Sequence, residues 1–63
     1  MSATTDIGSK IKKYRKEKKY TLKNLSEQTG LSIGFLSQLE RGITTIAIDS
    51  LANVADVLGV EMM

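Results

Sequence analysis

The charged side chains are unevenly distributed, and their positions indicate what kind of partner the surface could attract. Eight of the nine Lys and Arg residues lie within positions 1–23 beside two acidic residues, so this segment carries a net charge of +6. Positions 24–63 hold one Arg and five acidic residues, a net charge of −4. A basic segment of this kind attracts a polyanion such as nucleic acid, or an anionic membrane surface. The charge run alone fits a solvated helix face equally well.

Composition excludes several kinds of catalytic and metal site. The 63 residues include no His, no Cys and no Pro. Without His or Cys the chain cannot assemble a Ser-His-Asp or Cys-His catalytic group, a disulfide, or a thiolate or imidazole metal site. No carboxylate pair falls in an evident cleft, so we expect no enzymatic activity, no cofactor and no metal. Neither a signal peptide nor a bilayer-spanning segment is evident, and we expect a cytoplasmic location.

Apolar residues recur at helical spacing in four segments. The chain suffices for one small domain, which its 16 Ile, Leu and Val residues must stabilise by packing alone. Intervals of three and four residues predict helices that each bury one face. The expected helices and their inward residues are 6–19 (Ile7, Ile11, Tyr14), 21–29 (Leu22, Leu25), 32–41 (Phe35, Leu36, Leu39) and 48–58 (Leu51, Val54, Ala55, Leu58). We therefore expect an all-α fold, a compact bundle of four to five short helices.

Capping residues predict where these helices begin and end. The expected N-caps are Thr4 or Thr5, Thr21 and Ser32. The expected helix stops are Gly30, Gly42 and Gly59. The second and third helices, joined by Gly30-Leu31, match a helix-turn-helix, although any two helices can be joined in this way. The β-branched segment 43–48 would have no partner as a lone strand, so we expect a loop that buries its isoleucines.

The segment 21–42 resembles the helix-turn-helix of the lambda-repressor-like, Cro-type (XRE) family of bacterial and phage regulators; it reads TLKNLSEQTGLSIGFLSQLERG. The resemblance extends over residues 7–15 and 51–60 and so covers nearly the whole chain. Its most specific features are the spacings of Arg15, Gly30, Ser32, Leu36-Ser37-Gln38 and Glu40-Arg41-Gly42. It implies sequence-specific binding of double-stranded DNA by a nucleoid-associated transcription regulator, with the third helix entering the major groove N-terminus first.

The resemblance also implies which side chains of the third helix read bases. They are Ser32, Ile33, Gly34, Ser37 and Gln38. Gln38 carries a donor and an acceptor, which suits adenine N6 and N7, and Ile33 can contact apolar base features such as a thymine methyl. Gly34 lets the backbone approach closely. The sequence also allows two structural explanations: Ile33 could form a hydrophobic staple at the start of its helix, and Gly34 could avoid a clash with the second helix.

A second set of residues would hold the DNA backbone. The resemblance places Thr21 at the start of the second helix, where its hydroxyl and the free N–H groups can face a phosphate. Further charges and hydroxyls would come from Lys23, Arg41, Thr44 and Thr45. A diffuse basic field would come from Lys10, Lys12, Lys13 and Lys16. Arg15 and Glu40 are implied to form an internal ion pair that ties the first helix to the third.

Some positions depart from the family pattern. Lys19 stands where Gly commonly closes the first helix, so a left-handed residue there would be strained. Ile46-Ala47 replaces a common Pro-Ser, and Ala is a poorer N-cap than Ser by ~1 kcal/mol. Ser26 replaces a usual Ala. An apolar residue at position 46 resembles the pattern of restriction-modification controller proteins of the same family. A controller protein of this kind is therefore an alternative function for the chain.

The family usually has a fifth helix, often used for dimerisation, beyond the point where this chain stops at residues 61–63. The chain is therefore expected to be either unusually short or the N-terminal domain of a longer regulator. The sequence of residues 35–42 resembles that of regulators in which a cupin domain follows the DNA-binding domain. We expect a single domain over residues 1–63, with residues 1–5 flexible, and a homodimer on a palindromic operator. The alternative function is a protein-interaction module of the same fold, such as an antitoxin or anti-regulator.

Overall fold

Four helices make up most of the computed structural model, which describes residues 3–62 and the side chains of residues 7–62. They are α1 (Ala3–Glu17), α2 (Leu22–Thr29), α3 (Ile33–Glu40) and α4 (Ile48–Leu58). No strand occurs within residues 3–62, and the predicted all-α fold is confirmed, with four helices. The predicted ranges of the last three helices agree with α2, α3 and α4 once capping residues are counted. None of the described helices is long and apolar enough to cross a bilayer.

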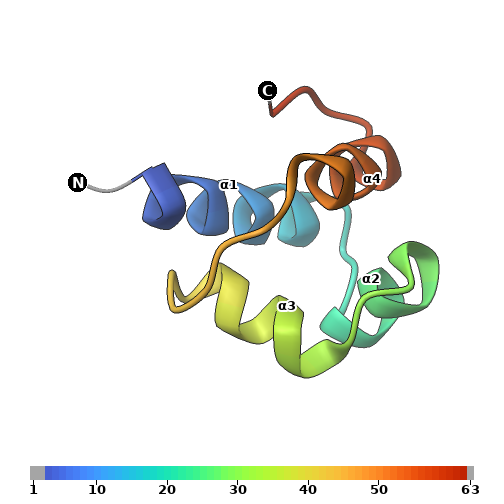
Figure 1. Cartoon of the computed structure of the whole chain (residues 1–63). Coiled ribbons are helices and arrows are strands. Elements are labelled where there is room, and N and C mark those ends of the chain that lie inside the picture. Colours follow the sequence, from blue (N-terminus) through green and yellow to red (C-terminus); the bar gives the residue numbers. More distant parts are fainter. Residues whose placement is uncertain (1–2, 63) are drawn as a thin grey trace.

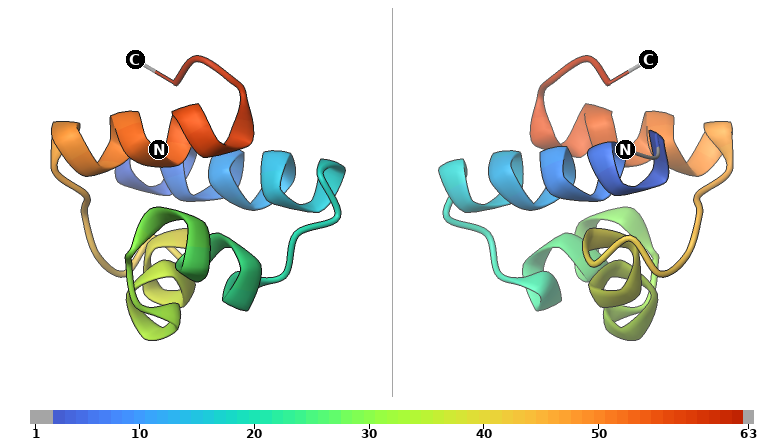
Figure 2. Two further views of the ribbon diagram at one scale, coloured as in Figure 1. Left: turned by 90° about the vertical axis from the view of Figure 1, so that its right-hand side faces the viewer. Right: turned by 90° about the vertical axis from the view of Figure 1, so that its left-hand side faces the viewer.

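The helices lie in two layers around one core. In Figures 1 and 2, α1 and α4 form the upper layer, and α2 and α3 form the lower one. Both α1 and α2 pack against α3 and α4. The buried core between the layers consists of Ile11, Leu25, Leu36, Leu39, Leu51, Val54 and Leu58. All seven lie on the inward faces predicted from spacing, and full burial of each such side chain contributes about 1.5–3 kcal/mol.

The first helix begins and ends earlier than predicted. It already includes Ala3, so Thr4 and Thr5 lie inside α1 and the prediction that one of them is its N-cap is wrong. No Gly or Pro stands between Ala3 and Gly8, and local helix propensity therefore lets the helix extend to its observed start. Residues 3–5 thus belong to α1, residues 1 and 2 lie outside the described part, and the flexibility of residues 1–5 stays a prediction.

Lys19 closes α1 in the left-handed conformation, with a φ of 60°. The amide of Tyr20 donates to the carbonyl of Arg15 (3.0 Å), and that of Lys19 donates to the carbonyl of Lys16 (3.0 Å). Glycine usually occupies the left-handed position of this hydrogen-bond pattern. A residue with a Cβ is strained there by about 1–2 kcal/mol, so the strain expected from the family pattern is present.

The connection between α3 and α4 has no strand, as predicted, but it buries only one isoleucine. Ile46 is half-buried against the core, whereas Ile43 is 60% and Ile48 72% exposed. The prediction that this loop buries its isoleucines is therefore wrong for two of the three. Residues 43–47 form no helix or strand and Ile48 begins α4, so no regular period directs these three side chains to one face.

Candidate nucleic-acid interface

The turn between α2 and α3 is held by hydroxyl side chains. Gly30 ends α2 with a φ of 78°, a conformation open to glycine, and redirects the chain. The Ser26 hydroxyl donates to the carbonyl of Leu31 at 2.5 Å. The Thr29 hydroxyl donates to the carbonyl of Leu25 (2.7 Å) and accepts from the amide of Leu31 (3.2 Å). The bonds to Leu31 satisfy its carbonyl and its amide, which lie in the turn between the helices, and they tie this residue to α2.

The outward side of α3 carries the residues predicted to read bases. Ser32 is exposed and caps the helix by accepting a hydrogen bond from the amide of Phe35 at 3.0 Å. Ile33, Gly34 and Gln38 are also exposed, and Ser37 is half-buried. In each view of Figures 1 and 2, α3 lies on the lower side of the molecule, away from α4. Four of the five residues are therefore exposed on the side of the molecule away from α4, and Ser37 is half-buried there.

Neither structural explanation for Ile33 and Gly34 fits the geometry. Ile33 is 46% exposed and is not among the side chains packed on the core, so it does not act as a hydrophobic staple. A Cβ placed on Gly34 would meet no atom within 4 Å, so Gly34 avoids no clash with α2. Both residues are unexplained by the packing of the domain itself.

The N-terminus of α2 forms a second polar site on the same lower side. The Thr21 hydroxyl oxygen accepts from the amide of Asn24 (3.0 Å), and the Asn24 side-chain oxygen accepts from the amide of Thr21 (3.1 Å). This reciprocal capping fixes the Thr21 side chain while leaving its O–H as a donor. Lys23, the second residue of α2, is exposed beside this cap. The site therefore offers a hydroxyl donor and a cation at the positive end of a helix.

The implied ion pair between Arg15 and Glu40 is present. Nε of Arg15 lies 2.7 Å from Oε2 of Glu40, and Nη2 donates to Oε1 at 3.0 Å, which makes the contact bidentate. Nη1 donates to the carbonyl of Tyr20 at 2.8 Å. Hydrogen bonding to the Glu40 carboxylate raises the pKa of Arg15 above its usual value. One guanidinium thus joins α1, the end of α3 and the residue preceding the cap of α2.

The other predicted phosphate-binding residues lie around the end of α3. Arg41 is exposed at the C-cap, and Thr45 is exposed in the following loop. Thr44 is half-buried, and its hydroxyl donates weakly to the carbonyl of Thr45 at 3.5 Å. The structure therefore leaves Arg41 and Thr45 free to reach outward, and it places Thr44 less favourably.

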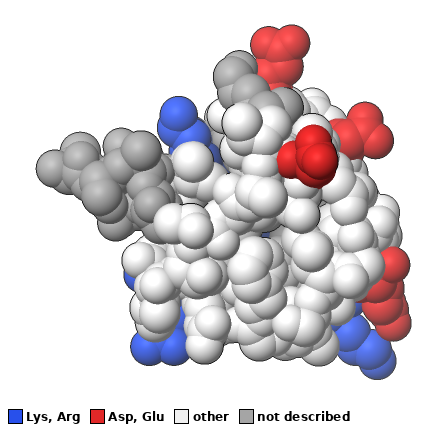
Figure 3. Space-filling view, viewed as in Figure 1, with Lys and Arg blue, Asp and Glu red and all other residues white. Residues whose placement is uncertain are grey.

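Charge is only partly separated over the surface. Figure 3 shows acidic side chains along the upper and right margins and basic side chains at the upper left and at both lower corners, and the two signs lie side by side at the lower right. The lysines assigned to the diffuse field are all exposed on α1: Lys10, Lys12, Lys13 and Lys16. Lys18 differs, because its Nζ lies 3.4 Å from where a Cβ of Gly59 would stand, at the negative end of α4.

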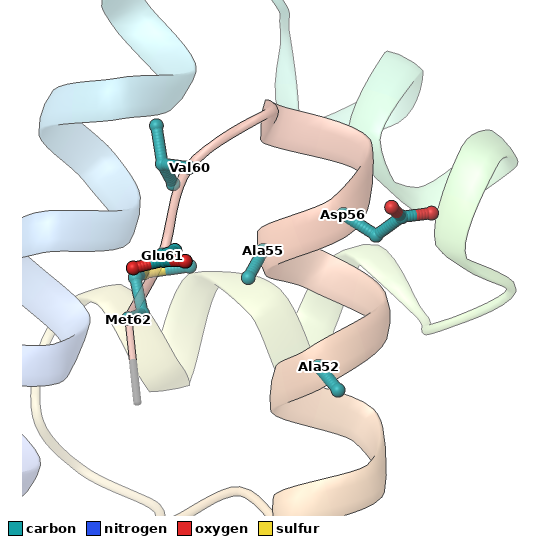
Figure 4. A pocket seen from close by; sticks show the side chains of 6 residues that line it. All are labelled: Ala52, Ala55, Asp56, Val60, Glu61 and Met62. Atoms are coloured by element: carbon teal, nitrogen blue, oxygen red, sulfur yellow. The ribbon is translucent and has the colours of Figure 1, made fainter.

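A separate hollow of about 340 Å³ lies between α4 and the segment after it. It is lined by Ala52, Ala55, Asp56, Val60, Glu61 and Met62. Figure 4 shows Ala52 and Ala55 on the helix and Val60, Glu61 and Met62 on the segment that follows. This hollow is on the layer opposite α3 and contributes nothing to the interface.

Three residues that support the interface were not singled out from sequence. Asn24 completes the cap of α2, a role that Glu or Gln usually signals at this spacing. Ser26 was noted only as a departure from Ala, yet its hydroxyl closes the turn. Gly8 is buried where α1 meets α3, and a Cβ there would stand 3.1 Å from the carbonyl oxygen of Glu40. Only the role of Ser26 had a local signal in the sequence, namely a Ser or Thr shortly before a turn glycine.

Comparison with known families matches residues 11–62 to the helix-turn-helix family HTH_3. The chain belongs to this family. The helix-turn-helix domain is 44% identical over 57 residues to the HTH-type transcriptional regulator SinR of Bacillus subtilis (strain 168), covering 89% of this chain and 51% of SinR. It is 36% identical over 56 residues to the immunity repressor protein of Bacillus phage phi105, covering 89% of this chain and 39% of the repressor. The chain spans about half the length of SinR.

Two solved structures have the same fold as this helix-turn-helix domain. The clp gene regulator ClgR from Corynebacterium glutamicum matches with a TM-score of 0.92 and 33% identity, over 95% of this chain and 64% of ClgR. SinR in complex with DNA matches with a TM-score of 0.82 and 45% identity, over 87% of this chain and 89% of that SinR chain. The resemblance to the XRE family is confirmed, and a position ahead of a cupin domain stays a prediction.

Proposed function

We propose that this helix-turn-helix domain binds double-stranded DNA sequence-specifically, as the DNA-binding part of a transcription regulator acting at the nucleoid in the cytoplasm. The observation that carries the proposal is the likeness to SinR, a regulator whose matching structure is a complex with DNA. The exposed outward side of α3 supports it, since Ile33, Gly34 and Gln38 are exposed there and do not pack on the core of the described fold.

In this proposal α3 lies in the major groove and α2 contacts the backbone. Base edges are read by Ser32, Ile33, Gly34, Ser37 and Gln38. Phosphates are held by Thr21, Lys23, Arg41, Thr44 and Thr45. The capped N-terminus of α2 supports the first two phosphate contacts, because a helix start offers free N–H groups and a positive dipole end to an anion. We further propose that the regulator acts as a homodimer on a palindromic operator, since two copies of such a motif address two half-sites.

The experiment is a titration of labelled duplex DNA by fluorescence anisotropy at several salt concentrations. Each phosphate neutralised by a cation releases counterions, so the logarithm of the binding constant falls linearly with the logarithm of salt. Lys23→Ala should weaken binding to every duplex and lower this slope by about one. Binding without salt dependence, or no binding to any duplex, would contradict the proposal and favour a protein-interaction module.

Lys18→Ala is the matched control, because it removes the same charge beside the C-terminus of α4 rather than at the start of α2. Its salt slope should equal that of the unmodified domain. Equal slope changes for the two variants would show that the lysines act only through overall charge, and the assignment of Lys23 to a phosphate would then be wrong.

A further inference from the structure

We propose that α3 reads an A·T-rich half-site, in which a thymine methyl group packs against Ile33 and Gly34 and an adenine about two base pairs away is bonded by Gln38. The inference rests on the proposed function and names the class of DNA sequence that this domain selects. It follows from the absence of charge on the reading side of α3, from an uncovered apolar spot at its first turn, and from helix geometry.

The reading side of α3 lacks the partners that G·C pairs commonly require. Guanine is most often recognised by Arg or Lys at O6 and N7, and cytosine N4 by Asp or Glu. Between Ser32 and Leu39 the sequence holds no charged residue. The Glu40 side chain is only 5% exposed and is paired with Arg15, and Arg41 stands at the C-terminal end of the helix. The side chains left to face base edges carry two hydroxyls, one amide and one alkyl group.

The first turn of α3 offers a place for a methyl group. Ile33 is exposed although it is apolar, and Gly34 beside it has open space where a side chain would stand. Glycine destabilises a helix relative to alanine, yet no contact within the described domain requires it here. In the major groove the thymine C5-methyl is the apolar feature of a base edge. An alkyl side chain next to bare backbone fits that methyl group.

Helix geometry sets the distance between the two contacts. Gln38 lies four residues after Gly34 in the same helix and therefore on nearly the same face. A rise of 1.5 Å per residue separates them by about 6 Å along the axis. Base pairs are stacked about 3.4 Å apart, so a helix lying along the groove spans about two base-pair steps between these residues. Gln38 can donate to and accept from adenine N6 and N7 in a bidentate contact.

The experiment uses the duplex that the unmodified domain selects from a random library, with each thymine replaced singly by uracil. Uracil lacks only the C5-methyl group, so one thymine per half-site should show a loss of about fourfold in affinity, the equivalent of one buried methyl group. Ile33→Ala should remove this difference between thymine and uracil. The matched control Ile48→Ala alters an exposed isoleucine at the start of α4 and should retain it.

Two further measurements test the spacing and the role of Gly34. Adenines are replaced singly by 7-deazaadenine, which lacks N7. At the base pair about two steps from the sensitive thymine, this replacement should lower the affinity of the unmodified domain roughly tenfold. The same replacement should not lower the affinity of the Gln38→Ala variant. Gly34→Ala should raise the melting temperature of the free domain and lower the preference for thymine over uracil.

Several results would overturn the inference while leaving sequence-specific DNA binding intact. These are a G·C-rich selected site, uracil substitution that is silent at every thymine, and a thymine preference that survives Ile33→Ala. If no duplex is enriched by selection, the proposed function itself fails.

Discussion

The guanidinium of Arg15 is the clearest case of one side chain that positions several elements. It is bonded to both oxygens of Glu40 and to the carbonyl of Tyr20, and the two charged side chains are only 11% and 5% exposed. Such a pair need not stabilise a fold relative to apolar residues, but removal of one partner leaves a poorly solvated charge.

Glu40→Ala should therefore lower the stability of the domain by about 3 kcal/mol, measured by thermal unfolding followed by circular dichroism. Arg15→Met should be similarly destabilising, and the double variant should be clearly more stable than the sum of the two losses predicts. Simple addition of the two losses in this double-mutant cycle would show that the residues are not coupled.

Gly8 is a buried residue whose importance only the structure reveals. A Cβ at this position would overlap the carbonyl oxygen of Leu39, so Gly8→Ala must push α1 away from α3. We expect a loss of about 1–3 kcal/mol, typical of overpacking. Ser9→Ala, at the exposed neighbouring position, is the control and should unfold within a few degrees of the unmodified domain. An unchanged melting temperature for Gly8→Ala would mean that the two helices do not approach closely.

At the scale of elements, helices with local boundary signals were predicted well. Thr21, Ser32 and Gly30 act on their own backbone neighbours, and so their positions alone define α2 and the start of α3. The exposure of Ile33, Gly34 and Gln38 follows from their outward positions on one such helix, and their role in reading bases stays a prediction. The start of α1 had no comparable signal.

Features that depend on contacts distant in the sequence could not be predicted from local pattern. The exposure of Ile43 and Ile48 depends on how the loop after α3 sits against the layers, and β-branching carries no such information. The contact of Gly8 with α3 joins residues some thirty positions apart, and the side-chain Nδ2 of Asn53 on α4 donates to the carbonyl of Thr29 at 2.7 Å across 24 positions.

The two weak helix boundaries can be improved. Lys19 has a positive φ, and Ala47 caps α4 without a side-chain hydrogen bond. Lys19→Gly and Ala47→Ser should each stabilise the domain by about 1 kcal/mol, because glycine removes the Cβ strain and serine supplies an acceptor for a free amide. In a domain of this size each gain corresponds to a rise in melting temperature of about 4–8 °C.

The control for this pair is Ile48→Ser, which introduces serine one residue too late to act as the cap and should not stabilise the domain. A fall in melting temperature on Lys19→Gly would contradict the left-handed conformation assigned to residue 19.

At the scale of the whole molecule, size limits how two copies can cooperate on DNA. The Cα trace measures 28 × 23 × 21 Å, and half-sites of such motifs lie about 34 Å apart. Two copies of residues 1–63 in adjacent major grooves would therefore meet only at their edges. A linked second copy raises avidity roughly 10²–10⁴-fold, and separate copies lack that gain.

We accordingly expect the 63-residue chain to be monomeric at micromolar concentration and to bind a full operator weakly, with the two half-sites filled independently. Analytical ultracentrifugation of the free chain checks the first expectation, and the Hill slope on a two-half-site duplex checks the second. A tight dimer in the absence of DNA would contradict this prediction and would place a dimer interface within residues 1–63.

The central claim is that the outward side of α3 reads DNA sequence, and selection of bound duplexes from a random library tests it most directly. The unmodified domain should enrich a reproducible motif. Gln38→Ala should lose preference at one base pair of that motif and bind the original site more weakly by about 1–3 kcal/mol, while the other positions keep their preference. An unchanged motif for Gln38→Ala, or no motif for the unmodified domain, would contradict the claim.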